Sequence, residues 1–438
     1  MQTAFVELAD ALCASIEGNE QLLLGFSGEQ SDFVRLNHNK VRQAGSVEQR
    51  VLRISLVHGQ RHSSASIVLS GDQEADLSRG KQSLHALREQ IPFLPEDPHL
   101  LFNEEVSSSS FEGPNDLPSA ADAIDQVVEA GEGLDLVGIW ASGGIHQGFA
   151  NSMGQRNWFS THSFNLDWSV YHQTDKASKN GYAGTSWDED ELRRRMMKAR
   201  TELEVLRRPA RTIEPGAYRV YLAPSALEEI TGLLSWGGFG LKAQRSKRSP
   251  LLRAVQGETQ LDKRFNLSEH TGAGLTPDFG ESGFRKPTRT PLFRDGVYAE
   301  PLVSPRSSKE YGVPTTGGQE APASLELEGG TLERDQLLSE LGTGVWINNL
   351  WYLNYSDLPA CRMTGMTRFT TLWVENGEIV APLNVMRFDD SFYRIFGDGL
   401  AGLTRERELL LSASTYGKRS TSSSLLPGAL VDGFRFTL

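Results

Sequence analysis

Alternation of apolar and polar residues with a period of two recurs through the first 170 positions and most constrains the fold. Within residues 21–70 the pattern includes Ala65, Ile67 and Leu69. Successive side chains of a strand point to opposite faces, so this pattern predicts strands of a sheet with one buried face. Residues 134–172 repeat the pattern around Gly-rich and Asn-rich turns, which indicates two or three further strands.

Four helices are expected around these strands, at about 3–17, 73–90, 119–130 and 188–208. The last of them begins with acidic residues and ends with basic ones, which suits the helix dipole. Residues 91–120 mix Pro, Ser and acidic residues with little periodicity, so we expect a surface loop there.

The second half of the chain also shows clear turn signals. Pro224 follows the strand pattern at 217–223 and is placed to open a helix. Two hairpins are predicted, at Asp295-Gly296 and at Asn376-Gly377. Residues 301–331 are rich in Pro, Gly, Ser and Thr and are expected to form an irregular, mobile loop.

These patterns predict an α+β fold with two domains. Residues 1–208 would form an N-terminal domain of sheet and helices, with the boundary near Pro209. Residues 209–438 would form a larger, mostly antiparallel β domain. One helix of this second domain, within 225–244, runs into Trp236-Gly237-Gly238-Phe239-Gly240. Each glycine inside a helix costs about 0.5–1 kcal/mol relative to alanine, so this segment needs an explanation.

Composition narrows the classes of function. The chain has 438 residues, with 44 basic and 56 acidic side chains and a net charge of −12. This sign disfavours nucleic acid as the main partner. Only Cys13 and Cys361 are present, too few for a disulfide framework or a cysteine-based zinc knuckle. No apolar run approaches the roughly 18 residues of a membrane span, so we expect a cytoplasmic protein with no membrane partner.

Common catalytic patterns are absent or out of context. His58 and His62 have the i, i+4 spacing of a zinc site but lie in a strand-to-turn segment, which favours a solvated hairpin end. No G-x-S-x-G occurs, so a nucleophile elbow is not indicated. Asp389 and Asp390 are neighbours on a predicted strand and would point to opposite faces, which favours a surface role.

Two further patterns favour structural roles. A single G-x-G-x-x-G at residues 397–402 lacks the helix and the acidic residue that dinucleotide binding requires, so it predicts a turn. The basic runs at 193–195 and 207–211 have acidic neighbours in sequence and are expected to form solvated helix faces.

Four stretches together resemble the TldD/PmbA family, once called modulators of DNA gyrase. They are TIEPGAYRVYLAPSALEEITGLLSWGGFGLKA, GFRKPTRTPLFRDGVYAEPLVSPRSSKEYG, LWYLNYSDLPACRMTGMTRFTTLWVENGEI and STYGKRSTSSSLLPGALVDGFRF. The third stretch, with T-G-x-T-R followed by W-V-E-N-G-E-I, is the most specific. The resemblance implies a cytoplasmic, two-subunit metalloprotease.

In the catalytic TldD type, a helix carries H-E-x-x-x-H and a Cys near the C-terminus completes the zinc site. Here Ser235 and Gly240 stand at the histidine positions, Trp236 at the Glu position and Tyr416 at the Cys position. None of these is a good zinc ligand. The resemblance is therefore closest to the PmbA/TldE branch, which lacks the zinc motif and pairs with a zinc-bearing TldD-type subunit. It implies no catalytic or metal-binding residue in this chain.

The role that the resemblance implies is to help bind and enclose unfolded or small peptides between the two subunits. Aromatic and polar residues of the third stretch are candidates to line that cavity: Trp346, Asn349, Trp351, Tyr352, Thr364 and Arg368. Three alternatives stay open: an independent hydrolase with an unrecognised site, a nucleic-acid- or gyrase-associated binding protein, and a homodimer that forms without a partner.

Overall fold

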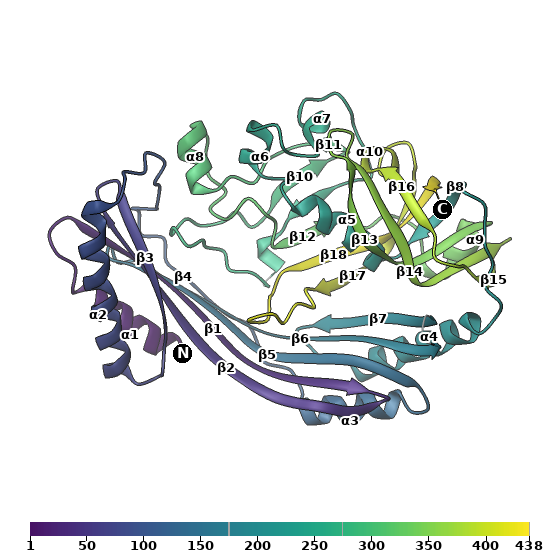
Figure 1. The fold of residues 1–438 in the computed structure, drawn as a ribbon, viewed down its shortest axis with the longest axis horizontal. Coiled ribbons are helices and arrows are strands. Elements are labelled where there is room, and N and C mark those ends of the chain that lie inside the picture. The colour runs from purple at the N-terminus through teal and green to yellow at the C-terminus, as the bar shows by residue number, and fades with distance from the viewer. Residues whose placement is uncertain (174–175, 274, 438) are drawn as a thin grey trace.

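A computed structural model describes residues 1–173, 176–273 and 275–437, and Figure 1 shows two stacked layers built around two sheets. The first layer comes from the first half of the chain. Its elements are α1 (Gln2–Cys13), β1 (Glu20–Asn37), β2 (Lys40–His58), β3 (Arg61–Val68), α2 (Gln73–Gln90), η1 (Ile91–Phe93), β4 (Ser109–Glu112), α3 (Ala120–Ala130), β5 (Asp135–Asn151), β6 (Arg156–Gln173), β7 (Lys176–Gly184) and α4 (Glu189–Leu206).

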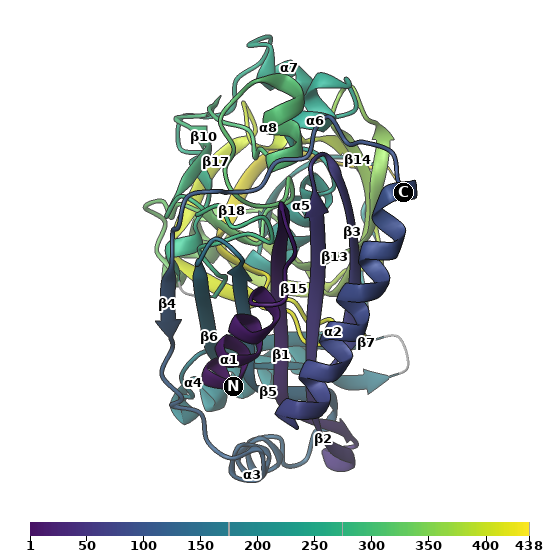
Figure 2. The same ribbon diagram turned by 90° about the vertical axis from the view of Figure 1, so that its left-hand side faces the viewer.

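The first sheet is long and curved. Its order within the described residues is β3-β2-β1-β5-β6-β4, and β7 pairs with β6. Helices α1 and α2 cover one end of the convex face, and α3 and α4 lie at the other end (Figures 1 and 2). Even-numbered residues of β1 such as Leu22 and Phe26 are buried on the α1–α2 side. Odd-numbered ones such as Glu29 and Ser31 face the second layer.

The second layer lies over the concave face of this sheet. Its elements are β8 (Gly216–Leu222), α5 (Pro224–Ser235), α6 (Leu241–Arg245), α7 (Leu252–Val255), β9 (Leu267–Glu269), η2 (Thr271–Ala273), β10 (Thr290–Arg294), β11 (Val297–Tyr298), α8 (Pro305–Tyr311), β12 (Ser324–Leu327), η3 (Arg334–Gln336), α9 (Leu337–Leu341), β13 (Gly344–Asp357), β14 (Arg362–Glu375), β15 (Glu378–Pro382), β16 (Arg387–Ser391), α10 (Phe392–Ile395), β17 (Leu400–Leu411) and β18 (Ser423–Phe436).

The second sheet closes partly on itself. Its order is β11-β10-β9-β12-β18-β16-β14-β13-β8, and β8 also pairs with β18. The strands from β18 through β16, β14 and β13 to β8 therefore form a ring. Helix α5 packs Leu227, Ile230 and Leu234 into the large core of this layer. The closed sheet thus holds α5 in a fixed position above the first sheet.

The predicted α+β class is confirmed, with mostly antiparallel pairing in both sheets. Among the described residues no helix is both long enough and apolar enough to cross a bilayer. Helix α1 ends at Cys13, four residues earlier than expected. The domain boundary near Pro209 stays a prediction, and it falls in the connection between α4 and β8.

Three local predictions are confirmed. Asp295-Gly296 and Asn376-Gly377 form tight hairpin turns in which every φ is positive, as Asn or Asp followed by Gly favours. The G-x-G-x-x-G segment forms the turn between α10 and β17, and no helix follows it in the described chain. The basic run at 193–195 in α4 pairs with acidic neighbours on the same helix, as Arg193 does with Glu189.

Three others were wrong. Residues 91–120 contain η1 and strand β4, which pairs in parallel with β6. Residues 301–331 contain α8, capped by the Ser304 side chain, and strand β12. Asp390 does not have a surface role: it is buried and accepts hydrogen bonds from Arg394 and from the Arg435 backbone N–H. A buried carboxylate needs such partners, and the sequence pattern does not show them.

Candidate functional site

The Trp236–Gly240 segment is a turn between two helices. Helix α5 ends at Ser235, so the expectation that the helix continues through this motif was wrong. Gly237 has a φ of +89°, and the Gly238 N–H donates to Leu234 O at 2.8 Å. A Cβ on Gly238 would lie 2.4 Å from that oxygen. The first two glycines are there because the chain must stop the helix and reverse close to its own backbone.

The four positions that the resemblance assigns to the zinc site do not fit a metal. Ser235 is the only one inside α5, and its hydroxyl donates to Thr231 O at 2.8 Å. The side chains of Trp236 and Tyr416 are 82% and 98% exposed. A Cβ on Gly240 would lie 2.8 Å from the Glu320 carboxylate. Zinc requires imidazole, thiolate or carboxylate ligands around one point, and these side chains do not supply them.

Other potential ligands are not gathered elsewhere in the part of the chain that the structure describes. There, no group of three or more His, Cys, Asp or Glu side chains is arranged to hold a metal ion. His58 ends β2 and His62 lies in β3, so the two flank a hairpin turn as the sequence indicated. His62 contacts Asp97 at 3.3 Å.

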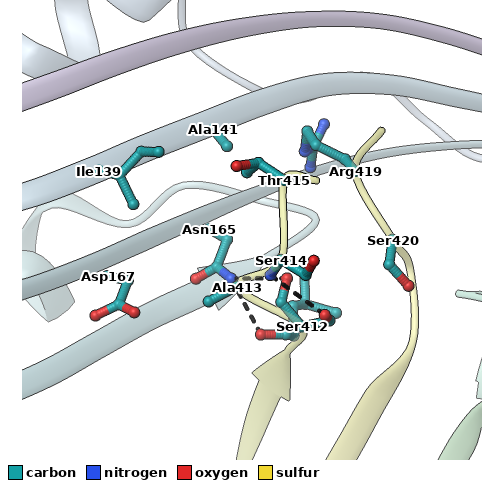
Figure 3. A pocket seen from close by; sticks show the side chains of 11 residues that line it. Ile139, Ala141, Asn165, Asp167, Ser412, Ala413, Ser414, Thr415, Arg419 and Ser420 are labelled. Carbon is teal, nitrogen blue, oxygen red and sulfur yellow. Dashed lines mark hydrogen bonds between the residues drawn. The ribbon is translucent and has the colours of Figure 1, made fainter. Parts of the chain in front are cut away.

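A small polar pocket lies between the concave face of the first sheet and the loop that joins β17 to β18. Figure 3 shows this loop, residues 412–422, crossing strands β5 and β6. Asn165 donates to the carbonyls of Leu411 and Ser412 at 3.0 and 3.3 Å. Lys418 donates to Ser27 Oγ at 2.9 Å. Tyr416 therefore lies on a loop that is hydrogen-bonded to the first layer.

Arg419 is the main anchor of this loop. Its side chain is only 5% exposed and donates to Ser163 O, Ser163 Oγ, Ser31 Oγ and Gly143 O at distances of 2.7 to 3.2 Å. The Arg419 backbone N–H donates to Glu29 Oε1 at 3.1 Å. Burial lowers the pKa of Arg419 from 12.5 to about 10, so the guanidinium is still charged at neutral pH.

An open groove of about 920 Å³ continues from this region across the concave face. Arg35, Arg42 and Lys179 contribute positive charge, and Asp167 contributes negative charge. Glu228, on the neighbouring face of α5, has its pKa raised to about 7 by burial and by the nearby carboxylates of Glu229 and Glu408. The groove can bind polar, extended molecules.

The six predicted cavity residues do not all come together. Asn349 is opposite Arg368 in the β13–β14 register, and the Arg368 guanidinium lies 4.1 Å from the ring centroid of Trp351. Trp351 and its neighbour Tyr352 are exposed. This cluster of aromatic and cationic side chains lies on the surface, and its role in binding stays a prediction.

The other two predicted residues have separate surroundings. Trp346 packs on Tyr221 with ring centroids 4.2 Å apart, and its indole N–H donates to Asn348 Oδ1. Thr364 donates to Phe388 O at 3.0 Å and so helps to hold β14 to β16. Sequence reasoning missed Arg419 because a basic residue in a Ser-rich loop is typical of a solvated segment.

Comparison with known proteins agrees with this architecture. Residues 215–438, just over half of the chain, match the family model for the PmbA/TldA metallopeptidase C-terminal domain. The metalloprotease PmbA of Escherichia coli O157:H7 is 28% identical over 142 residues. That match covers 32% of this chain and 30% of the relative's length.

Solved structures share the whole fold at low identity. TldE from Thermococcus kodakarensis superposes with a TM-score of 0.78 at 12% identity, over 99% of this chain and 100% of that one. A candidate modulator of a DNA gyrase from Thermotoga maritima has a TM-score of 0.77 at 16% identity, with the same coverage. A similar protein from Bacteroides thetaiotaomicron has a TM-score of 0.73 at 14% identity, over 99% of this chain and 98% of that one. The family-model match, together with this shared fold, shows that the chain belongs to the TldD/PmbA family.

Proposed function

We propose that this chain is the non-catalytic, TldE/PmbA-like subunit of a two-subunit cytoplasmic metalloprotease, in which a TldD-type partner carries the zinc. The observation that supports this most directly is the set of side chains at the four positions that the resemblance assigns to the zinc site. Gly240 has no side chain, and the Glu320 carboxylate occupies the space that a larger residue would need. Ser235 already donates its hydroxyl to the helix backbone. A general base is missing as well, because Trp236 stands at the Glu position.

The part that we assign to this chain is to form one wall of the peptide-binding cavity. The open groove of the concave face is lined by Asn37 and Gln43, whose polar side chains suit hydrogen bonds to a peptide main chain. Main-chain recognition tolerates many sequences, as a protease of unfolded or small peptides requires. Arg419 and Lys418 fix the β17–β18 loop at the cavity, so its exposed tip at Tyr416 is available to a partner subunit.

A reconstitution assay tests this proposal. Cleavage of a fluorogenic peptide mixture would be measured with this chain alone, with a TldD-type subunit alone and with both together. We expect cleavage only in the mixture, and a heteromer on size-exclusion chromatography. Treatment of the TldD-type subunit with a chelator before mixing is the control and should abolish cleavage.

Two outcomes would contradict the proposal. Cleavage by this chain alone, together with stoichiometric zinc in the purified chain, would favour an independent hydrolase. Failure to associate with any TldD-type subunit, combined with a stable homodimer, would favour a partnerless member of the family.

A further inference from the structure

A second cavity, of about 170 Å³, lies between the two layers on the other side of Lys179. Helix α4 and strand β7 line it from the first layer, and β8, α5, η3, β13 and β17 line it from the second. At roughly 30 Å³ for each water molecule, it has room for about six waters or for one small organic molecule. None of the four positions that the resemblance assigns to the zinc site lines this cavity.

Most of the charged side chains around this cavity are already paired. Arg195 pairs with Glu408 and Glu191, and Arg194 also pairs with Glu191. Lys179 pairs with Asp167. The Arg195–Glu408 pair connects the two layers, and none of these ion pairs needs a ligand to balance its charge.

Two buried polar groups that line the cavity have no hydrogen-bond partner among the described residues. Tyr221 is only 5% exposed, and its hydroxyl makes no hydrogen bond within the described chain. Glu406 has a buried carboxylate oxygen, Oε2, without a hydrogen-bond partner. Arg334, which also lines the cavity, is exposed and has no carboxylate within 4 Å in the described parts of the structure. Buried polar groups of folded proteins are nearly always hydrogen-bonded, so orphans that line one cavity point to a bound molecule.

The N-terminus of α5 adds a donor to the same cavity. The helix begins at Pro224, which has no N–H, and Ser225 also lines the cavity. The Ser225 N–H has no acceptor among the described residues, as is typical of the first turn of a helix. Such an N-terminus favours an anionic group.

We propose that this cavity binds a small zwitterion, such as a free amino acid or a dipeptide. The ligand carboxylate would lie at the α5 N-terminus and the Arg334 guanidinium, and the ammonium group would lie at the Glu406 carboxylate and the Tyr221 hydroxyl. The face of Trp346 bounds the cavity beside Tyr221.

Calorimetric titration of the purified full-length chain with the dipeptide Ala-Ala tests this inference, and it requires no partner subunit. A mispaired or inactive peptidase complex would therefore not affect the result. We expect saturable binding at ligand concentrations up to about 10 mM, because a Kd near 1 mM would fill most sites there. N-acetyl-Ala-Ala and Ala-Ala-amide each lack one charge and should bind at least about tenfold more weakly.

Variants locate the site. Tyr221→Phe and Glu406→Gln remove a hydroxyl and a charge with little change in shape, and each should weaken Ala-Ala binding about tenfold. Tyr218→Phe, on the same strand, and Glu378→Gln, on an exposed hairpin, are the matched controls and should leave binding unchanged.

Several results would overturn the inference. They are an absence of binding by any probe at about 10 mM, equal binding of the blocked and free dipeptides, binding of acetate as tight as that of Ala-Ala, or unchanged binding in both cavity variants. If a variant does not fold, the comparison of free and blocked dipeptides on the unmodified chain still decides the question.

Discussion

Replacement of Arg419 by methionine tests whether one buried side chain fixes the β17–β18 loop to the first sheet. The guanidinium donates four hydrogen bonds. Bonds from a charged donor contribute about 1.5–3 kcal/mol each, so the set contributes about 6 kcal/mol at the lower end. Burial of the charge opposes this. The decrease in pKa from 12.5 to about 10 corresponds to about 3 kcal/mol. The balance predicts that Arg419→Met destabilises the closed loop by about 3 kcal/mol.

Hydrogen exchange measured by mass spectrometry is the appropriate assay, because the loop can open without global unfolding. A loss of about 3 kcal/mol should speed exchange of the amides in residues 412–422 on the order of 100-fold. The control is Arg405→Met, which removes an exposed arginine of β17 that contacts Glu333 at 2.8 Å. It should leave exchange in the loop unchanged.

One result would refute this reasoning. If exchange in residues 412–422 is the same in Arg419→Met as in the Arg405→Met control, the four hydrogen bonds do not hold the loop. The loop would then be kept in place by other contacts, such as those of Asn165 and Lys418.

Three further predictions concern α5 and the turn that follows it. Gly238→Ala should destabilise the protein by about 2 kcal/mol or more, because its Cβ would meet a backbone oxygen. Gly232→Ala is the control: its Cβ would lie in open space on the helix, so it should stabilise the protein by about 0.5–1 kcal/mol. Urea unfolding measures both changes in the free energy of unfolding. The pKa of Glu228 is raised to about 7 in the folded state, so the folded state binds more protons than the unfolded state between about pH 4.5 and 7. Stability should therefore fall as the pH rises through this range, and Glu228→Gln should flatten that fall in a series of melting curves; an unchanged slope would contradict the assignment. Introduction of histidine at both Ser235 and Gly240 should not create a zinc site, because Glu320 fills the space beside Gly240. Elemental analysis measures the bound zinc, and a stoichiometric amount in the double variant would contradict this prediction.

Much of the fold could be predicted because its signals are local. The alternation at Ala65 and Ile67 identifies strand β3, since successive side chains point to opposite faces. The Asn376-Gly377 pair identifies a tight hairpin turn, since both residues readily adopt a positive φ. Where the signal was compositional the prediction failed, as in residues 301–331, because a Ser or Pro residue can start a helix as well as interrupt one.

The candidate site was predictable only in part. The resemblance identified Ser235, Trp236, Gly240 and Tyr416 as the relevant positions, but it did not explain why glycines stand in this segment. That reason for Gly240 is Glu320, which lies 80 positions later in the chain and occupies the space beside it. No pattern within 225–244 contains this information, because the contact depends on how β11, α8 and the following loop return to α6.

By itself, the sequence determined the long strands of the first sheet, most of the longer helices, the two hairpin turns and the types of side chain at the four positions of the zinc motif, because each depends on neighbouring residues and on side-chain chemistry. Only the tertiary structure decided that Arg419 is buried, that Tyr221 and Glu406 line one cavity and that α5 stops at Ser235. The physical reason is that burial and pairing are properties of two segments brought together. The same arginine or tyrosine is solvated or buried according to what packs against it.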